Sequence, residues 1–199
     1  AYVALFQGAF GSSEAILRTL EKATPLIFSG LAVAFAFKAG LFNIGGQGQL
    51  LMGAIVAAYI GFAVDGLPFI IHMPLALLAG SLAGAAYAAI AGFLKAYTGA
   101  HEVITTIMLN YIAINITDYL SNGPWKDEGI IARTPKILET AAIPKWGFLP
   151  AGFLIACLMA FVTWYLLYRT TWGYAIRTTG LNSNAALYAG IKVTQIIVL

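Results

Sequence analysis

The chain has 199 residues, of which 60% are hydrophobic and only 10% are charged, and its mean hydropathy is +0.84. A soluble domain carries about 25% charged residues, so this composition excludes a water-soluble globule. The formal net charge of +3 comes from scattered basic residues that form no stripe, and this excludes nucleic acid as a partner.

Apolar runs separated by short polar stretches predict an all-α, polytopic helical membrane protein. Residues 1–10 are typical of the end of a span or of an interfacial segment, and residues 11–22 are polar enough to begin a short amphipathic helix. Complete spans are predicted at residues 23–38, 49–64, 74–94, 103–120 and 150–168, and a last one begins near residue 191. We therefore expect five complete spans with partial spans at the ends, in one transmembrane domain over residues 1–199 that is a fragment of a longer protein.

A helix break is predicted between the first two complete spans. Residues 39–48 contain four glycines, one asparagine and one glutamine, and these residue types do not sustain a helix that faces lipid. Backbone that leaves a helix at membrane depth must be buried in protein or line a wet cavity, because lipid cannot satisfy its hydrogen bonds. The amides of Asn43 and Gln47 offer both donors and acceptors there, which suits contact with a polar solute.

The next two spans each carry a distinctive face. The span at residues 74–94, which we expect to start at Pro74, has small residues every four positions, and a face without bulk favours close helix packing over lining a pore. These small residues are Gly80, Gly84, Ala88 and Gly92. The following span has a polar face formed by Glu102, Thr106, Asn110 and Thr117. Polar faces look into a helix bundle, where both interhelical hydrogen bonding and a place in a solute pathway remain open.

Two segments outside the spans have patterns of their own. Residues 121–149 hold three of the seven prolines and mixed charges, which indicates an extramembrane loop. Residues 172–191 are typical of a short helix that stops at Gly180, a cap at Asn182 and a second short helix that ends at Gly190. A compact helical hairpin of this kind suits docking in a groove of a partner, and a plain interfacial loop fits the same pattern.

The sequence contains no catalytic or metal-binding pattern. His101 and Glu102 are not followed by a second histidine at the spacing of a zinc-protease helix, and the glycine-rich residues 45–48 lack the Lys-Ser/Thr of a phosphate loop. Cys157 lies alone in an apolar run, where a small packing residue is expected. We therefore expect a protein that is not an enzyme, that binds no cofactor or metal, and that depends on another subunit for any ATP hydrolysis.

Alternation of the spans places the charged residues on two sides of the membrane. One side has five of the eleven basic residues and one of the eight acidic residues, and the other side has the remaining six and seven. The positive-inside rule, which counts Lys and Arg, does not decide between them. The net charge favours the cytoplasm for the first side, which includes residues 169–190.

Three blocks of the sequence resemble bacterial nucleoside-type ABC importer permeases, a branch of the branched-chain amino acid and ribose permease superfamily. The first block is FNIGGQGQL at residues 42–50, and the second is TGAHEVI at residues 98–104 followed by MLNYI at residues 108–112. The third runs from Arg177 to Ile191 and resembles the loop that contacts the ATPase subunit. Gly46 stands where the family has alanine, and His101 stands where asparagine is commoner.

The resemblance implies a permease subunit of an ATP-driven importer in the bacterial plasma membrane, with nucleosides as substrates and simple sugars such as ribose next. It implies an ABC ATPase subunit, a second related permease subunit and an extracytoplasmic substrate-binding lipoprotein as partners, besides membrane lipid. It places residues 169–190 in the cytoplasm as a coupling hairpin and residues 121–149 on the extracytoplasmic side.

We expect the helix break and the polar helix face to supply the residues that line or border the substrate pathway. These are Asn43, Gln47, Glu102, Thr106 and Asn110. Coupling to the ATPase is expected from hairpin residues, with an acidic edge of the ATPase as the partner of the arginine. These are Arg177, Gly180, Asn182, Ala185, Ala186 and Gly190. Two other classes stay open: a gradient-driven secondary transporter or channel for a small polar solute, which also uses broken helices, and a membrane assembly subunit.

Overall fold

The computed structural model describes residues 2–146 and 149–198. Within these ranges the chain forms nine α-helices and two short strands. The helices are α1 (Tyr2–Phe10), α2 (Ser13–Lys38), α3 (Gly46–Ala63), α4 (Phe69–Thr98), α5 (Glu102–Asn122), α6 (Ala151–Arg169), α7 (Thr171–Leu181), α8 (Ser183–Tyr188) and α9 (Val193–Val198). The strands β1 (Lys145–Trp146) and β2 (Leu149–Pro150) form one antiparallel pair just before α6. Apart from this pair, the predicted all-α architecture is confirmed.

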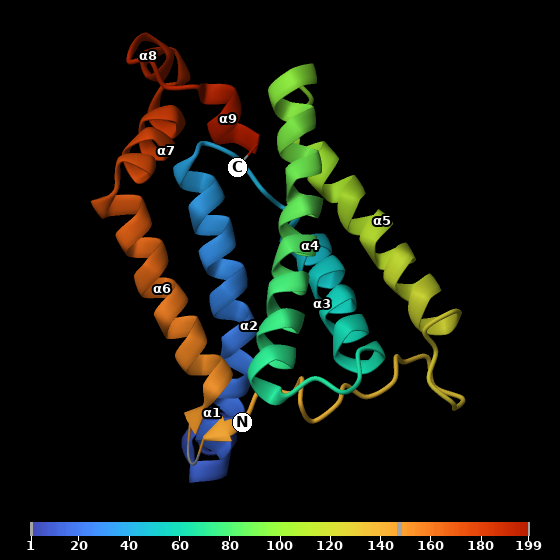
Figure 1. The fold of residues 1–199 in the computed structure, drawn as a ribbon. Coiled ribbons are helices and arrows are strands. Elements are labelled where there is room, and N and C mark those ends of the chain that lie inside the picture. Colours follow the sequence, from blue (N-terminus) through green and yellow to red (C-terminus); the bar gives the residue numbers. More distant parts are fainter. Residues whose placement is uncertain (1, 147–148, 199) are drawn as a thin grey trace.

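Five of the described helices, α2 to α6, are long and apolar enough to cross a membrane. Little of each helix is buried within the chain, so most of its apolar side chains are available to lipid or to other subunits. Figure 1 shows α2 and α6 side by side, while α3, α4 and α5 pack against one another. The five complete spans predicted from the sequence are therefore confirmed.

The two ends of the bundle differ in what they carry. The short helices α7, α8 and α9 lie beyond the last turn of α6, with α7 beside the last turn of α2 and α9 against α4 (Figure 1). We call this the hairpin end and define it by residues 171–198. The opposite end contains α1, the start of α4 and residues 123–146 and 149–150 (Figure 1), and we call it the loop end.

Two predicted helix starts are corrected by the structure. The polar residues 11–22 do not form a helix of their own, because α2 is continuous from Ser13 to Lys38. The Ser12 side chain accepts a hydrogen bond from the Ala15 N–H, and this cap starts the helix early enough to include the polar stretch. The helix predicted to start at Pro74 begins at Phe69, with Pro74 inside it; a proline within a membrane helix is tolerated where neighbouring groups satisfy the freed backbone.

The small-residue face of α4 allows α3 to approach it closely, as predicted. A Cβ atom placed on Gly80 would lie 2.8 Å from both the Gly53 carbonyl oxygen and the Ala57 Cβ of α3. A Cβ atom on Gly84 would lie 3.1 Å from the Gln49 carbonyl oxygen of the same helix. Any side chain at Gly80 therefore separates the two helices, and this contact explains the glycines at positions 80 and 84. Gly92 of the same face lies instead against α9, where a Cβ would be 2.8 Å from the Ile197 carbonyl oxygen.

A buried histidine, which sequence reasoning did not select, anchors the loop end. His72 of α4 is completely buried, and its Nδ1 lies 2.8 Å from the Thr140 hydroxyl while its Nε2 lies 3.0 Å from the Ile60 carbonyl oxygen. The Leu138 N–H donates to the Gly61 carbonyl oxygen nearby. The connection between α5 and β1 is thus anchored on α3 and α4. The predicted loop at residues 121–149 begins two residues later, because α5 extends to Asn122, and its residues 147–148 lie outside the described ranges.

Replacing Gly80 with valine tests the α3–α4 contact. The added side chain must push against the backbone of α3, and overpacking of this kind costs about 1–3 kcal/mol. We expect a lower melting temperature for the full-length variant in detergent. The matched control is Gly30→Val in α2, where a Cβ meets no atom within 4 Å. Equal melting temperatures for the two variants would show that the contact does not need glycine.

Candidate functional site

The chain leaves its helical path between α2 and α3. After Lys38 the backbone turns through Gly40, whose φ of 77° lies in the left-handed region that favours glycine. Residues 41–44 are not helical, and α3 begins at Gly46. The predicted break is confirmed, with the correction that residues 46–48 already belong to the first turn of α3.

An asparagine from α5 hydrogen-bonds the backbone at this break. The Asn110 Oδ1 accepts from the Gly48 N–H at 2.8 Å, and its Nδ2 donates to the Ile44 carbonyl oxygen at 3.0 Å. Both ends of one side-chain amide are therefore occupied by backbone groups that have no helical partner. For Asn110, interhelical hydrogen bonding is the interpretation that the geometry supports.

The side-chain amides of Asn43 and Gln49 also form hydrogen bonds at this break. The Asn43 Oδ1 accepts from the Gly45 N–H at 2.8 Å. The Asn43 and Gln49 side chains also pair with each other, at 3.3 Å and 3.2 Å for the two N···O distances. Sequence reasoning did not select Gln49, although it lies inside the FNIGGQGQL motif, because it fell at the start of the predicted span.

The break forms one wall of a cavity of about 470 Å³, which is within the usual size range of small-molecule sites. Three of the predicted pathway residues, Asn43, Glu102 and Thr106, line this cavity together with Gln49. Gln47 is exposed and Asn110 faces the break, and neither is among the cavity's lining residues. Thr106 is buried, and its hydroxyl donates to the Glu102 carbonyl oxygen at 2.7 Å within its own helix.

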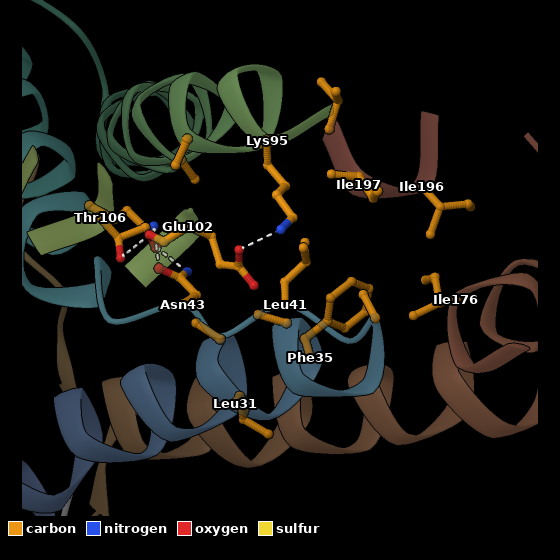
Figure 2. Close-up of a pocket in the computed structure, with 18 of the residues that line it drawn as sticks. Leu31, Phe35, Leu41, Asn43, Lys95, Glu102, Thr106, Ile176, Ile196 and Ile197 are labelled. Carbon is orange, nitrogen blue, oxygen red and sulfur yellow. Dashed lines mark hydrogen bonds and ion pairs between the residues drawn. The ribbon is translucent and has the colours of Figure 1, made fainter. Parts of the chain in front are cut away.

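The polar side of the cavity contains an ion pair. Lys95 in the last turn of α4 and Glu102 in the first turn of α5 point toward each other in Figure 2, with 2.8 Å between Nζ and Oε2. A tight turn with Gly99 in the left-handed region joins the two helices. Sequence reasoning did not select Lys95 for the site, although a basic last turn followed closely by an acidic first turn was a signal for the pair.

The opposite side of the cavity is apolar. Figure 2 shows Phe35 and Leu41 close to the ion pair, with Ile176 of α7 and Ile196 of α9 further along. Phe28 and Trp172 also line the cavity. An apolar wall facing a few polar groups is the usual composition of a site for a small organic molecule. No three His, Cys, Asp or Glu side chains within residues 2–146 and 149–198 are grouped so that they could bind a metal ion.

The predicted hairpin next to the cavity is present as α7 and α8. Asn182 caps α8, because its Oδ1 accepts from the N–H groups of Asn184 and Ala185 at 3.0 Å and 3.1 Å. Gly190 has a φ of 79° and follows α8, which ends two residues earlier at Tyr188. Ala185 is exposed on α8, whereas Ala186 is buried.

The role predicted for Gly180 as a helix stop is wrong, because α7 continues to Leu181. Gly180 is instead in close backbone contact with Gly40 of the helix break. A Cβ atom on Gly180 would lie 2.7 Å from the Gly40 backbone nitrogen, and one on Gly40 would lie 2.9 Å from the Gly180 Cα. The hairpin and the cavity wall therefore meet backbone to backbone.

Arg177 makes its contacts inside the chain. Its Nη1 donates to the Leu167 carbonyl oxygen in the last turn of α6, and its guanidinium lies 4.9 Å from the centre of the Tyr168 ring. The hairpin instead presents apolar side chains outward, with Leu181 88% and Tyr188 95% exposed. Neither residue was selected from the sequence, because an isolated apolar residue in a short helix carries no signal of exposure.

Comparison with known proteins places this arrangement in a family. Over 98% of its length the chain is 42% identical to the guanosine ABC transporter permease protein NupP of Bacillus subtilis (strain 168), and it covers 57% of that protein. It is 32% identical to the nucleoside ABC transporter permease protein NupB of Lactococcus lactis subsp. cremoris (strain MG1363), over its full length and 58% of that protein. It is 33% identical to the glucose ABC transporter permease protein TsgB13 of Haloferax volcanii, over 96% of its length and 54% of that protein.

The chain thus spans less than two thirds of the length of these relatives. No solved structure matches it. Residues 15–199 match the family described as branched-chain amino acid transport system / permease component. The chain therefore belongs to this permease family, and with its five apolar helices it is a multi-pass protein of the bacterial plasma membrane.

Proposed function

We propose that this chain is a membrane-spanning permease subunit of an ATP-driven importer for nucleosides. The observation that carries the proposal is the cavity beside the helix break, which joins a polar wall to an apolar one in a chain of the permease family. A nucleoside has the same division, with a flat base and a ribose rich in hydroxyl groups. The names of two relatives, which refer to guanosine and to nucleosides, support this choice of solute.

The pathway residues have different tasks in this proposal. Asn43, Glu102 and Thr106 line the cavity with Gln49, so they are placed to meet the solute. Asn110 maintains the break through its two backbone hydrogen bonds. Gln47 is exposed in the first turn of α3 and does not line the cavity. It is proposed to border the substrate pathway next to the break.

The hairpin of α7 and α8 is proposed to receive the motion of a partner ATPase in the cytoplasm. Its outer surface is apolar at Leu181, Leu187 and Tyr188, and such a surface suits burial in a groove. Because Arg177 binds the end of α6, it holds the hairpin on the spans rather than meeting the ATPase. Gly180 is proposed to pass the motion to the break, and the remaining coupling residues shape α8: Asn182, Ala185, Ala186 and Gly190.

Two further partners complete the proposal. Bacillus subtilis has two proteins named as guanosine ABC transporter permeases, NupP and NupQ, to which this chain is 42% and 28% identical. This pairing supports a second, related permease beside the present chain. The loop end is proposed to face an extracytoplasmic substrate-binding lipoprotein. ATP is hydrolysed by the partner ATPase, and the present chain is a transport subunit.

Charging the hairpin tip tests the ATPase contact. We expect full-length wild-type protein, purified from detergent-solubilised membranes, to retain an ABC ATPase. The double variant Leu181→Glu with Tyr188→Glu should lose at least about 90% of it, because two buried charges without partners oppose docking. Gly190→Trp should also lose it, since tryptophan is strained at a positive φ.

Ile131→Glu provides a matched control for the tip variants, because it charges an exposed apolar residue at the loop end. It should keep the ATPase. If the wild-type protein retains no ATPase, the importer is the wrong class and gradient-driven transport is the next test.

Asn110→Leu tests the amide that binds the break. The variant leaves the Gly48 N–H and the Ile44 carbonyl oxygen without their side-chain partner, and an unsatisfied buried polar group costs about 1–3 kcal/mol. We expect a lower melting temperature and a loss of nucleoside uptake. Asn115→Leu is the control in the same helix, because Asn115 donates only to the Tyr111 carbonyl oxygen one turn away. Unchanged uptake in Asn110→Leu would exclude this residue from the pathway's support.

A further inference from the structure

One carboxylate holds three segments of the chain together beside the cavity. The Glu102 Oε2 lies 2.8 Å from the Lys95 Nζ at the end of α4. The same carboxylate accepts hydrogen bonds from the backbone N–H of Phe42, in the helix break, and from its own N–H at the start of α5. The Glu102 side chain is only 16% exposed, and its Oε2 is buried. The carboxylate is therefore occupied within the chain, where it joins α4, α5 and the break.

The Phe42 N–H depends on Glu102 for its partner. Residues 41–44 are not helical, so this N–H has no helical acceptor, and at membrane depth such a group must be satisfied inside the protein. The Phe42 ring stacks on the Phe37 ring of α2, with 5.0 Å between the ring centroids. Phe42 is thus held by α2 through its side chain and by α5 through its backbone. Both of these helices line the cavity.

Lys95 allows a carboxylate to occupy this position. Among the described residues that line the cavity, Lys95 and Glu102 are the only charged ones. A buried charge without a partner is costly, and the ammonium group offsets the charge of Glu102. The short turn at Gly99 already joins α4 to α5, and a partly buried ion pair is weak evidence for stability. The contact of Glu102 with the break explains the pair better than the packing of α4 on α5 does.

We propose that Glu102 and Lys95 are positioning residues that hold the helix break against α5 and so keep the cavity closed on the side of the hairpin; this inference rests on the proposed function. Figure 1 shows the end of α4 and the start of α5 on that side of the bundle. Figure 2 shows the ion pair next to Leu41 of the break. In this role Glu102 acts on the solute pathway through the Phe42 backbone, besides lining the cavity itself.

The contact lies close to the point where the hairpin meets the break. Gly40, which contacts Gly180 of α7, is two residues before Phe42, which is at most about 7 Å of chain. A movement of Gly40 therefore pulls the Phe42 N–H away from the carboxylate. Glu102 and Lys95 stay paired during this movement, so that no charge is left alone. A hydrogen bond to a charged group shifts such an equilibrium about 10- to 150-fold, which is enough to favour the closed arrangement until the hairpin moves.

The test measures how readily water reaches the cavity in the full-length protein, assembled with its partner subunits in lipid nanodiscs, without nucleotide or solute. Cys157 is replaced by serine, and every other native cysteine is replaced too. Ala88→Cys, which lines the cavity from α4, then reports the rate of reaction with a charged, water-soluble thiol reagent. Ile130→Cys, which is fully exposed at the loop end, is the control reporter and should react at one rate in every variant.

Three variants separate the ion pair from the contact with the break. Glu102→Met and Lys95→Met both remove the ion pair, but only Glu102→Met removes the acceptor of the Phe42 N–H. We expect Glu102→Met to raise the reaction rate of Ala88→Cys at least about tenfold, and Lys95→Met to raise it less. Exchanging the charges, by Lys95→Glu with Glu102→Lys, keeps an ion pair but no acceptor, because an ammonium group accepts no hydrogen bond. This double variant should react as fast as Glu102→Met.

Asp127→Asn is the matched control for loss of an ion pair. It breaks the contact of Asp127 with Arg133, which measures 2.9 Å and lies at the loop end. Its cavity reporter should react at the wild-type rate. A second readout uses ATP: Glu102→Met should still hydrolyse ATP, while nucleoside uptake per ATP falls at least about tenfold. A purely structural defect would lower hydrolysis and uptake together.

The opposite pattern would overturn the inference. If Lys95→Met and Glu102→Met react equally fast and the charge exchange restores the wild-type rate, the pair only joins α4 to α5. The inference also fails if all three variants react as slowly as the wild type. Should Glu102→Met not assemble, the charge exchange is compared with Lys95→Met for the same decision. Wild-type protein that takes up no nucleoside would contradict the proposed function, whereas the reaction rates, measured without solute, still decide the inference.

Discussion

The structure depends on one requirement: backbone groups that leave a helix inside a membrane must still be hydrogen-bonded. Between α2 and α3 the Gly45 and Gly48 N–H groups and the Ile44 carbonyl have no helical partner, and the side chains of Asn43 and Asn110 supply it. Because Asn110 comes from α5, the same hydrogen bonds attach α5 to the start of α3. Leu41 and Asn43 of this irregular segment then form part of the wall of the cavity.

The two ends of the bundle are stabilised by different chemistry. At the loop end, His72 and the backbone of α3 fix the connection that follows α5. At the hairpin end, Arg177 donates a hydrogen bond to the last turn of α6, and the backbone of Gly180 contacts that of Gly40. The connection that follows α5 is thus anchored to α3 and α4, whereas α7 is anchored to α2 and α6, and α9 packs against α4. The cavity lies between these two groups of helices, where a relative movement of the groups changes its walls.

The sequence was sufficient for the spans, the break and the Asn182 cap, because each depends on residues close together in the chain. Hydropathy and length identify a span, and glycines clustered with amides identify a break. It was not sufficient for the partners of Asn110 and Arg177, which lie 62 and 10 residues away. A polar helix face shows that a polar neighbour exists, but the identity of that neighbour is decided by packing. The contact between Lys95 and Glu102 had a local signal but was not selected, and Gly180 was misplaced as a helix stop because α7 continues to Leu181.

The contact between Gly40 and Gly180 has a mechanical consequence. Side chains normally absorb small displacements by changing rotamer, whereas two glycine backbones in van der Waals contact have no such slack. A push on α7 toward α2 must therefore move residue 40 by a similar amount, together with the non-helical segment that leads to Asn43. The contact between Gly40 and Gly180 therefore resists compression. Among the described contacts, no backbone hydrogen bond joins the two residues and resists their separation. In the proposed coupling, α7 can therefore push the cavity wall toward α2 but does not pull it back.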